Sequence, residues 1–128
     1  MFDNLDVFTL SHAMARHAGK RQAVVSQNMA NADTPGYVAR DVAPFSAHVS
    51  GEDAFAARAT RPGHLFGAAP GRDFEVMTDR TAARDPNGNS VSLESEMLRG
   101  VEAKRQHDRA LAIYKSGLTV LRTALGRN

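Results

Sequence analysis

Residues 28–37 read Asn-Met-Ala-Asn-Ala-Asp-Thr-Pro-Gly-Tyr, and they mark the point where a long helical pattern stops. Asn31 is a residue type that takes the left-handed conformation at the C-terminus of a helix. Pro35 and Gly36 suit the centre of a type II turn, in which the glycine has a positive φ. Asn28 and Asn31 are spaced to lie on one helix face, where their amides can bridge to a neighbouring backbone. The stretch therefore predicts a helix stop followed by a tight turn.

The residues before this stretch predict one amphipathic helix over 5–30. Its apolar side chains recur at spacings of three, four and seven residues, which places them along one stripe. The members of the stripe are Val7, Leu10, Met14, Ala18, Val25 and Met29. The stripe is narrow, and packing supplies most of the stability of a helix, so this helix needs a partner.

The middle of the chain, residues 31–91, has a different composition. It contains all five prolines and six of the ten glycines, and its apolar pieces are short, such as Phe-Glu-Val-Met at 74–77. This density of turn-forming residues predicts extended chain, turns and a short β-hairpin. The middle is either loop-rich or partly disordered in the isolated molecule.

Residues 92–126 predict a second long helix. Ser92 suits the N-cap, and Glu94 and Glu96 lie near the positive end of the helix dipole. Apolar residues then repeat with heptad spacing, most strongly from Leu111 onward. We expect a seam between the two helices, in the same or an adjacent subunit, formed by Leu10, Met14, Val25, Leu111, Leu118, Leu121 and Leu125.

These patterns together predict a mainly α fold with one domain over residues 1–128. Its two long terminal helices would form an antiparallel helical hairpin or coiled coil around a Pro/Gly-rich irregular middle. No apolar run approaches the roughly 18 residues that span a bilayer. The first residues carry acidic side chains in place of a basic leader, so we expect no cleavable signal peptide.

Composition excludes several kinds of site. The chain has no cysteine, which excludes disulfides, thiolate nucleophiles and cysteine-ligated zinc. None of its five histidines pairs at i, i+4 with a supporting carboxylate, and no glycine-rich nucleotide motif or serine elbow occurs. We therefore predict no catalytic residue, no cofactor and no metal site, and hence no enzyme.

One acidic loop resembles a calcium loop of the helix–loop–helix type. Ligand oxygens would come from Asp85, Asn87, Asn89 and Glu96. However, Ser90 occupies the position where the sharp turn requires glycine. A Pro-Asn-Gly turn that begins the last helix explains the same residues more simply, and a calcium-binding module is the third-ranked interpretation.

The basic residues of the last helix leave one alternative function open. The formal net charge is +2, and the basic side chains along this helix include Lys104, Arg105, Arg109, Lys115 and Arg122. They can meet phosphate, but Glu102 and Asp108 are interleaved with them, which favours a solvated or intersubunit face. A small basic helical nucleic-acid-binding protein is the alternative function.

The stretch at 28–37 also resembles the signature of the flagellar basal-body rod family, N-x-A-N-x-x-T-x-G-Y after the first helix. The motif residues here are Asn28, Ala30, Asn31, Thr34, Pro35, Gly36 and Tyr37. Further matches, at 21–22, 37–42, 60–65 and 89–94, resemble the members that form the proximal part of the rod.

This resemblance implies a structural subunit that polymerises into the torque-transmitting shaft of the bacterial flagellar basal body, where the rod crosses the periplasm. It implies as partners copies of the chain itself, other rod subunits of the FlgC, FlgF and FlgG type, and a rod-to-ring adaptor of the FliE type. It also implies the flagellar type III export apparatus as a partner. It implies neither nucleic-acid binding nor direct insertion into a membrane.

The resemblance further implies roles for two short segments. The motif residues would work as an assembly joint. Phe45-Ser-Ala-His-Val49 resembles a short export element with an aromatic residue and an apolar residue four apart. Phe45 and Val49 would share one face if the segment became helical on docking to the export gate. The alternative is that both residues pack against the terminal helices.

Overall fold

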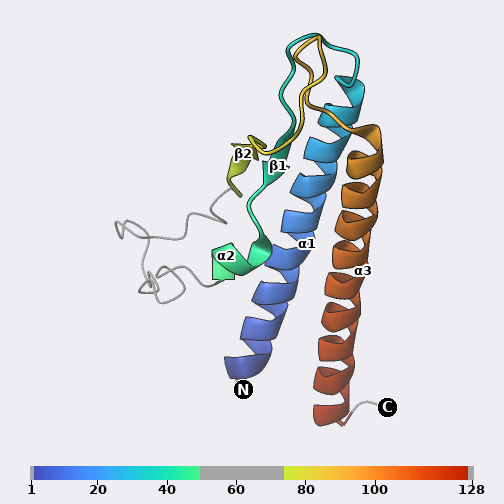
Figure 1. Cartoon of the computed structure of the whole chain (residues 1–128). Coiled ribbons are helices and arrows are strands. Elements are labelled where there is room, and N and C mark those ends of the chain that lie inside the picture. Colours follow the sequence, from blue (N-terminus) through green and yellow to red (C-terminus); the bar gives the residue numbers. More distant parts are fainter. Residues whose placement is uncertain (1, 50–73, 127–128) are drawn as a thin grey trace.

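The computed structural model describes residues 2–49 and 74–126, and of residues 2–5 it describes the backbone alone. The elements are α1 (Phe2–Ala30), β1 (Arg40–Val42), α2 (Phe45–Val49), β2 (Val76–Thr78) and α3 (Leu93–Ala124). Two long helices therefore account for most of the described backbone (Figure 1). The sequence match at 60–65 lies outside the described residues.

Helices α1 and α3 lie side by side and run in opposite directions (Figure 1). The ring of Phe8 lies against Gly117 near one end of the pair, and Val25 lies against Gly100 nearer the other end. The hydroxyl of Ser92 accepts a hydrogen bond from the Ser95 N–H at 3.4 Å, so Ser92 is the N-cap of α3. This confirms the prediction of a mainly helical chain whose long terminal helices pack together.

Small residues form the seam between the two helices. On α1 the buried positions include Ser11, Ala18 and Val25, and on α3 they include Ala103 and Ala110. These positions recur every seven residues, as at the contact line of paired helices. Short side chains there allow the two backbones to approach closely.

The seam within this chain therefore differs from the predicted leucine seam. Leu10 is 48% exposed, Leu111 is 43% exposed and Leu125 is 78% exposed. Val25 is buried, while Met14, Leu118 and Leu121 are half-buried. The prediction placed large apolar residues between the helices, whereas the residues buried between α1 and α3 are mostly small.

A small antiparallel sheet lies against α1 (Figure 1). Its register pairs Arg40 with Thr78 and Val42 with Val76. The middle of the chain therefore holds a short antiparallel strand pair, whose two strands are separated by residues 43–75. A core of Val24, Val42 and Phe74 joins the sheet to α1, and Phe45 packs against it. Among the described residues, no helix is long and apolar enough to cross a membrane.

Candidate functional site: the joint at the end of the first helix

The chain after α1 is held to the end of that helix by the side chain of Asn28. This side chain is fully buried, and its Nδ2 donates to the carbonyl of Arg40 at 2.7 Å. Its Oδ1 accepts from the Arg40 N–H at 3.1 Å and from the Tyr37 hydroxyl at 3.2 Å. One amide thus satisfies both backbone groups of Arg40 at the start of β1, which sets the path by which the chain leaves the helix.

The turn that follows contains a glycine with positive φ. The Tyr37 N–H donates to the Thr34 carbonyl at 3.2 Å, and Gly36 has a φ of 73°, as predicted. The predicted left-handed conformation of Asn31 is wrong, because every positive φ in the described part of the chain belongs to a glycine. Asn31 instead donates its amide to the Gln27 carbonyl at 2.8 Å and accepts from the Thr34 hydroxyl at 3.2 Å. Side-chain bonds thus replace the left-handed cap.

This turn touches a second loop, which lies directly before α3. The Gly36 N–H donates to the Asn87 carbonyl at 3.0 Å. Gly88 has a φ of 82°, and a Cβ placed on it would lie 3.3 Å from the Gly36 Cα. The two loops pack backbone to backbone because both positions lack a side chain.

Asn89 fastens the second loop to the end of α1. Its side chain is 1% exposed. Its Nδ2 lies 2.7–2.9 Å from the carbonyl oxygens of Asn31, Ala32 and Thr34, and its Oδ1 accepts from the Val91 N–H at 2.8 Å. Carbonyls at the end of a helix have no partner within the helix, and Asn89 supplies a donor to them. The sequence reasoning missed this role, although an Asn-Gly-Asn run shortly before a helix cap was its visible signal.

Ser90 extends the same contact toward β1. Its N–H donates to the Tyr37 carbonyl at 3.0 Å, and its hydroxyl accepts from the Ala39 N–H at 2.8 Å. Residues 28–39 and 85–91 therefore form one hydrogen-bonded unit, which we call the tip joint. It lies at the end of the helix pair far from both chain termini (Figure 1).

The loop geometry favours the turn interpretation over calcium binding. The Gly88 N–H donates to the Asp85 carbonyl at 2.8 Å, which closes a turn. The side-chain oxygen of Asn87 accepts from the Asn89 N–H at 3.0 Å, so it is occupied by the loop itself. Within residues 2–49 and 74–126, no three histidine, cysteine, aspartate or glutamate side chains are grouped closely enough to hold a metal ion.

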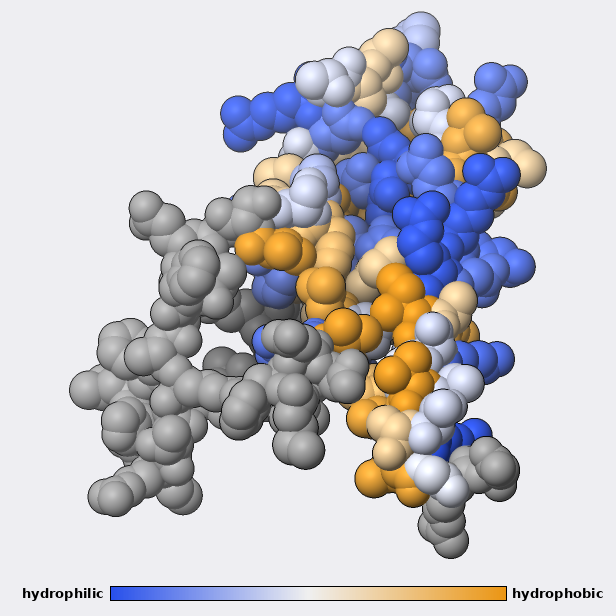
Figure 2. Space-filling model, turned by 90° about the horizontal axis from the view of Figure 1, so that it is seen from below, coloured by the Kyte–Doolittle hydropathy of each residue, from blue (hydrophilic) through white to orange (hydrophobic). Residues whose placement is uncertain are grey.

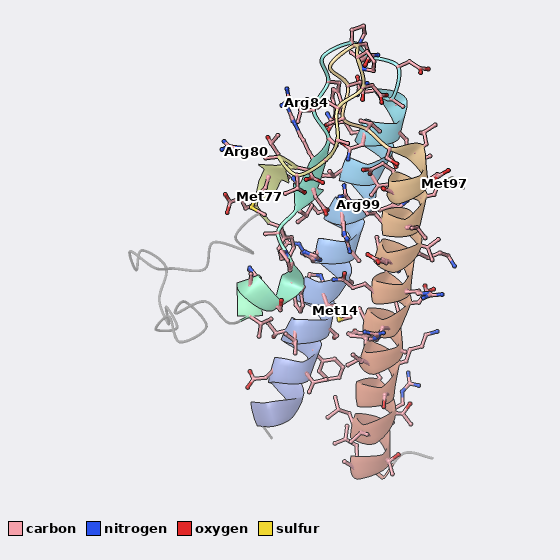
Figure 3. The ribbon with its side chains drawn as sticks, viewed as in Figure 1. Met14, Met77, Arg80, Arg84, Met97 and Arg99 are labelled. Carbon is pink, nitrogen blue, oxygen red and sulfur yellow. The ribbon has the colours of Figure 1, made fainter. Side chains whose placement is uncertain are left out.

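Arg99 gathers three carboxylates beside the tip joint, between α3 and the sheet (Figure 3). Its guanidinium lies 2.8 Å from Asp79, 3.0 Å from Glu96 and 3.8 Å from Asp41. Hydrogen bonds from the Arg99 guanidinium and from the Thr81 hydroxyl lower the pKa of Asp79 from 3.8 to about 2. The network ties β1 and the residue that follows β2 to α3.

His17 links α1 to α3 and to the segment before α2. It is 2% exposed; its Nε2 lies 2.7 Å from the Ala43 carbonyl and its Nδ1 lies 2.8 Å from the Gln106 amide nitrogen. Since a carbonyl only accepts, Nε2 carries the proton and Nδ1 accepts from Gln106. The ring also meets Phe74 edge to face, with centroids 4.9 Å apart. The imidazole is therefore a packed structural group.

The segment that resembles an export element is already helical, since it forms α2. Phe45 is half-buried, packs against the core of Val24, Val42 and Phe74, and lies 5.5 Å from His17 between ring centroids. Val49 is 42% exposed. The geometry therefore gives Phe45 a packing partner within the chain and leaves Val49 on the surface.

Charges of both signs alternate along α3, as the sequence suggested. Lys104 lies 3.6 Å from Asp108, and Glu102 lies 3.2 Å from Arg21 of α1. These pairs break up the basic surface that a phosphate backbone would need.

A second surface is apolar and lies toward the end that carries both chain termini. Figure 2 shows hydrophobic side chains gathered around that end of the molecule. The exposed large apolar residues on this part of the two helices are Val7, Leu10, Leu111, Ile113, Tyr114, Val120 and Leu125. Contiguous exposed apolar surface is typical of sites that contact another protein.

Comparisons with known proteins converge on one family. Residues 9–37, which cover most of α1 and the first turn of the tip joint, match the family model for flagella basal body rod proteins. The flagellar basal body rod protein FlgB of Agrobacterium fabrum is 34% identical over 117 residues, covering 88% of this chain and 87% of that protein.

Proposed function

Because this chain belongs to the family of flagellar basal body rod proteins and is a structural subunit of the rod, we propose that it polymerises into the proximal, torque-transmitting shaft. The observation that carries this proposal is the exposure of large apolar side chains on a helix pair whose own seam is already filled by small residues. Those side chains stay in contact with water in the single chain, and contacts between subunits would bury them. The comparisons give no support to the nucleic-acid-binding alternative.

The proposed partners follow from the rod assignment. We propose copies of this chain, rod subunits of the FlgC, FlgF and FlgG type, and an adaptor of the FliE type as neighbours in the periplasm. Residues 1–128 would form one rod-subunit domain. Helices α1 and α3 would pack against helices of neighbouring subunits in coiled-coil contacts. Within that contact Leu10, Leu111, Leu118, Leu121 and Leu125 would become buried.

The tip joint has a proposed role in assembly. It gives α1 and α3 a defined relative position through buried hydrogen bonds of Asn28 and Asn89. A rigid connection between the two helices presents their outer faces to a neighbour at a constant angle, which lowers the entropy lost on assembly. The motif residues, from Asn28 to Tyr37, would therefore act by shaping the subunit.

The proposed route out of the cell is the flagellar type III export apparatus. Phe45 and Val49 are the proposed export element, and the exposure of Val49 supports a contact with a receptor. A double variant, Phe45→Ala with Val49→Ala, should accumulate in the cytoplasm while its purified form still co-assembles with rod subunits. Normal secretion with failed assembly would assign both residues to packing instead.

The rod function is tested by complementation of a deletion strain of the source bacterium. Deletion should abolish swimming and external flagella, and the unaltered chain should restore both. Leu111→Glu should fail to restore them although the purified variant keeps its helical circular dichroism, because a charge at the interface opposes burial. Ser116→Glu adds the same charge at an exposed polar position of α3 and should restore swimming. A deletion strain that swims would contradict the proposed function.

A further inference from the structure

The loop before α3 contains the one Asn-Gly pair of the chain, Asn87-Gly88. An asparagine is chemically unstable when glycine follows it, because glycine has no side chain to keep its backbone nitrogen away from the asparagine amide. That nitrogen can attack the Cγ of the asparagine and close a five-membered succinimide ring. The asparagines at 4, 28, 31 and 89 precede larger residues, which hinder the same attack. Asn87 is therefore the asparagine among these that is most open to spontaneous modification.

The tip joint holds the peptide group between Asn87 and Gly88 on both sides. The Gly88 N–H donates to the Asp85 carbonyl at 2.8 Å, and the Asn87 carbonyl accepts from the Gly36 N–H at 3.0 Å. The Asn87 Oδ1 accepts from the Asn89 N–H at 3.0 Å, which also restrains the side chain. Ring closure requires the Gly88 nitrogen to lose its proton and the peptide group to turn toward Cγ. Both movements break these hydrogen bonds, so the ring forms only after the loop opens locally.

The joint itself requires the residue that makes Asn87 unstable. Gly88 has a φ of 82°, and a Cβ placed on it would lie 3.3 Å from the Gly36 Cα. A larger residue, which would slow ring closure, therefore strains position 88. The side chain of Asn87 is exposed, so water reaches it. The same glycine permits both the close contact of the two loops and the attack on Asn87.

We propose that Asn87 is a deamidation site whose reaction is suppressed while the tip joint is closed and proceeds when the joint opens. The Gly88 nitrogen gives its proton to a base in solution and bonds to the Asn87 Cγ. The bond from Cγ to Nδ2 breaks, and Nδ2 takes up a proton and leaves as ammonia. Water then opens the ring at one of its two carbonyl carbons and gives aspartate or isoaspartate. The inference goes beyond the proposed rod function and does not depend on it.

The isoaspartate product does not fit the closed joint. In that product the main chain runs through the former side chain, so Gly88 is attached one carbon further along. The former Asn87 carbonyl, which accepts from the Gly36 N–H, becomes a free carboxylate. The backbone contact between Gly88 and Gly36 leaves no room for the added carbon. A chain with isoaspartate at 87 should therefore keep its two long helices and lose the contacts between residues 28–39 and 85–91.

Peptide mapping by mass spectrometry tests the site on the purified chain in mildly alkaline buffer. Deamidation at Asn87 should be at least about tenfold slower in the folded chain than in a synthetic peptide of residues 83–92, because only the open fraction reacts. Asn87→Gln should remove the signal from this position, since glutamine would have to close a larger ring.

Two variants separate the tip joint from overall stability. Asn28→Ala removes buried hydrogen bonds of the joint and should bring the rate closer to that of the peptide. Ala110→Leu is the matched control, because it disturbs the buried seam and leaves the hydrogen bonds of the joint in place, so its rate should stay near that of the unaltered chain. Circular dichroism checks that both remain helical. If Asn28→Ala does not fold, Ser90→Ala replaces it, since it removes the hydroxyl that accepts from the Ala39 N–H.

Hydrogen exchange tests the effect of the product. Ion exchange separates modified from unmodified chains by their added negative charge. The N–H groups of Gly36 and Ser90 should be protected in the unmodified chain and unprotected in the isoaspartate chain, while amides around Ala103 in α3 stay protected in both.

Three results would overturn the proposal. Deamidation of the folded chain at the rate of the peptide would show that the joint gives no protection. Equal rates for Asn28→Ala and Ala110→Leu would assign the protection to overall stability. Protection of the Gly36 N–H in the isoaspartate chain would show that the joint accommodates the product.

Discussion

The two ends of the helix pair differ in whether their side chains find contacts within the same chain. At the tip joint, buried Asn28 and Asn89 have partners for their amide groups, and every one of those partners is supplied by the same chain. At the opposite end, which we call the open end, large apolar side chains of α1 and residues 111–125 of α3 remain exposed. The tip joint is complete in a single subunit, whereas the open end is not.

The two ends differ in role: hydrogen bonds at the tip joint fix the arrangement of the helices, and exposed apolar surface is available for contacts with other molecules. Buried polar groups are costly unless they are hydrogen-bonded, so the tip joint permits one arrangement of the two helices. Apolar surface has no such directional requirement, and it gains free energy against any surface that excludes water. We therefore expect the tip joint to set the shape of the monomer, and the exposed apolar side chains of α3, both at the open end and at Met97, Leu98 and Val101, to be available for contacts between subunits. Substitutions at the two ends should accordingly change different measured quantities.

The largest loss of stability is expected for Asn28→Ala. The substitution removes the fully buried Asn28 amide and leaves both the N–H and the carbonyl of Arg40, which are partly buried, without their side-chain partner. Each buried group left unpaired costs about 1–3 kcal/mol, so the free energy of unfolding should fall by about 2–5 kcal/mol in urea denaturation. Asn31→Ala is the control. The side-chain hydrogen bonds of Asn31 are exposed, so this variant should lower the free energy of unfolding by less than about 1 kcal/mol. Equal losses for both variants would contradict the account of the tip joint.

Enlarging the seam is expected to have the next largest effect. Ala110 is 1% exposed between the helices, so Ala110→Leu forces them apart and should lower the free energy of unfolding by about 1–3 kcal/mol. Its neighbour Leu111 lies on the exposed face, and Leu111→Ala should leave the stability of the monomer nearly unchanged while weakening assembly. Thermal denaturation together with sedimentation measures both quantities. A monomer destabilised more by Leu111→Ala than by Ala110→Leu would place the seam on the leucines after all.

The two touching glycines should differ from each other in a smaller but measurable way. Both have positive φ, which costs an alanine roughly 1–2 kcal/mol. A Cβ on Gly36 meets nothing within 4 Å, whereas a Cβ on Gly88 lies 3.3 Å from backbone. Gly88→Ala should therefore lower the free energy of unfolding more than Gly36→Ala does in the same denaturation experiment. The reverse order would show that the loops do not approach as closely as described.

The smallest effect is a dependence of stability on acid. The pKa of Asp79 is lowered from 3.8 to about 2 by the hydrogen bonds of Arg99 and Thr81. Its ionised form therefore stabilises the fold above about pH 4, and this contribution is lost as the pH falls toward 2. Asp79→Asn should reduce the fall in unfolding free energy over that interval, and Thr81→Val should reduce it partly. If Asp79→Asn showed the same fall in unfolding free energy at acid pH as the unaltered chain, Asp79 would not be a source of the pH dependence.

Local signals account for the parts of the fold that sequence reasoning obtained. Both long helices follow from apolar residues at helical spacing, and the start of α3 follows from the capping preference of Ser92. The positive φ of Gly36 follows from the turn chemistry of a Pro-Gly pair. Each of these preferences depends on a few neighbouring residues, so each is visible in the sequence.

Contacts between distant residues account for what was missed. The pairing of β1 with β2 joins residues on either side of 43–75, and no periodic pattern indicated it. Asn89 was considered as a calcium ligand, and only its approach to the end of α1 reveals it as a donor to carbonyl groups. The ion network around Arg99 likewise depends on side chains that are distant in sequence, from α3, from β1 and from Asp79 just after β2.

The helix seam shows most clearly the difference between what local sequence signals specify and what contacts between distant residues decide. The sequence alone specified two long helices with heptad repeats and a motif that relates the chain to rod proteins. It did not specify which stripe of each helix faces the other, because leucines and alanines repeat side by side with the same period. In the tertiary structure the buried stripe carries small residues such as Ala18, Ala103 and Ala110, while Leu10, Leu111 and Leu125 are exposed, because the contact between two distant helices decides which stripe is buried.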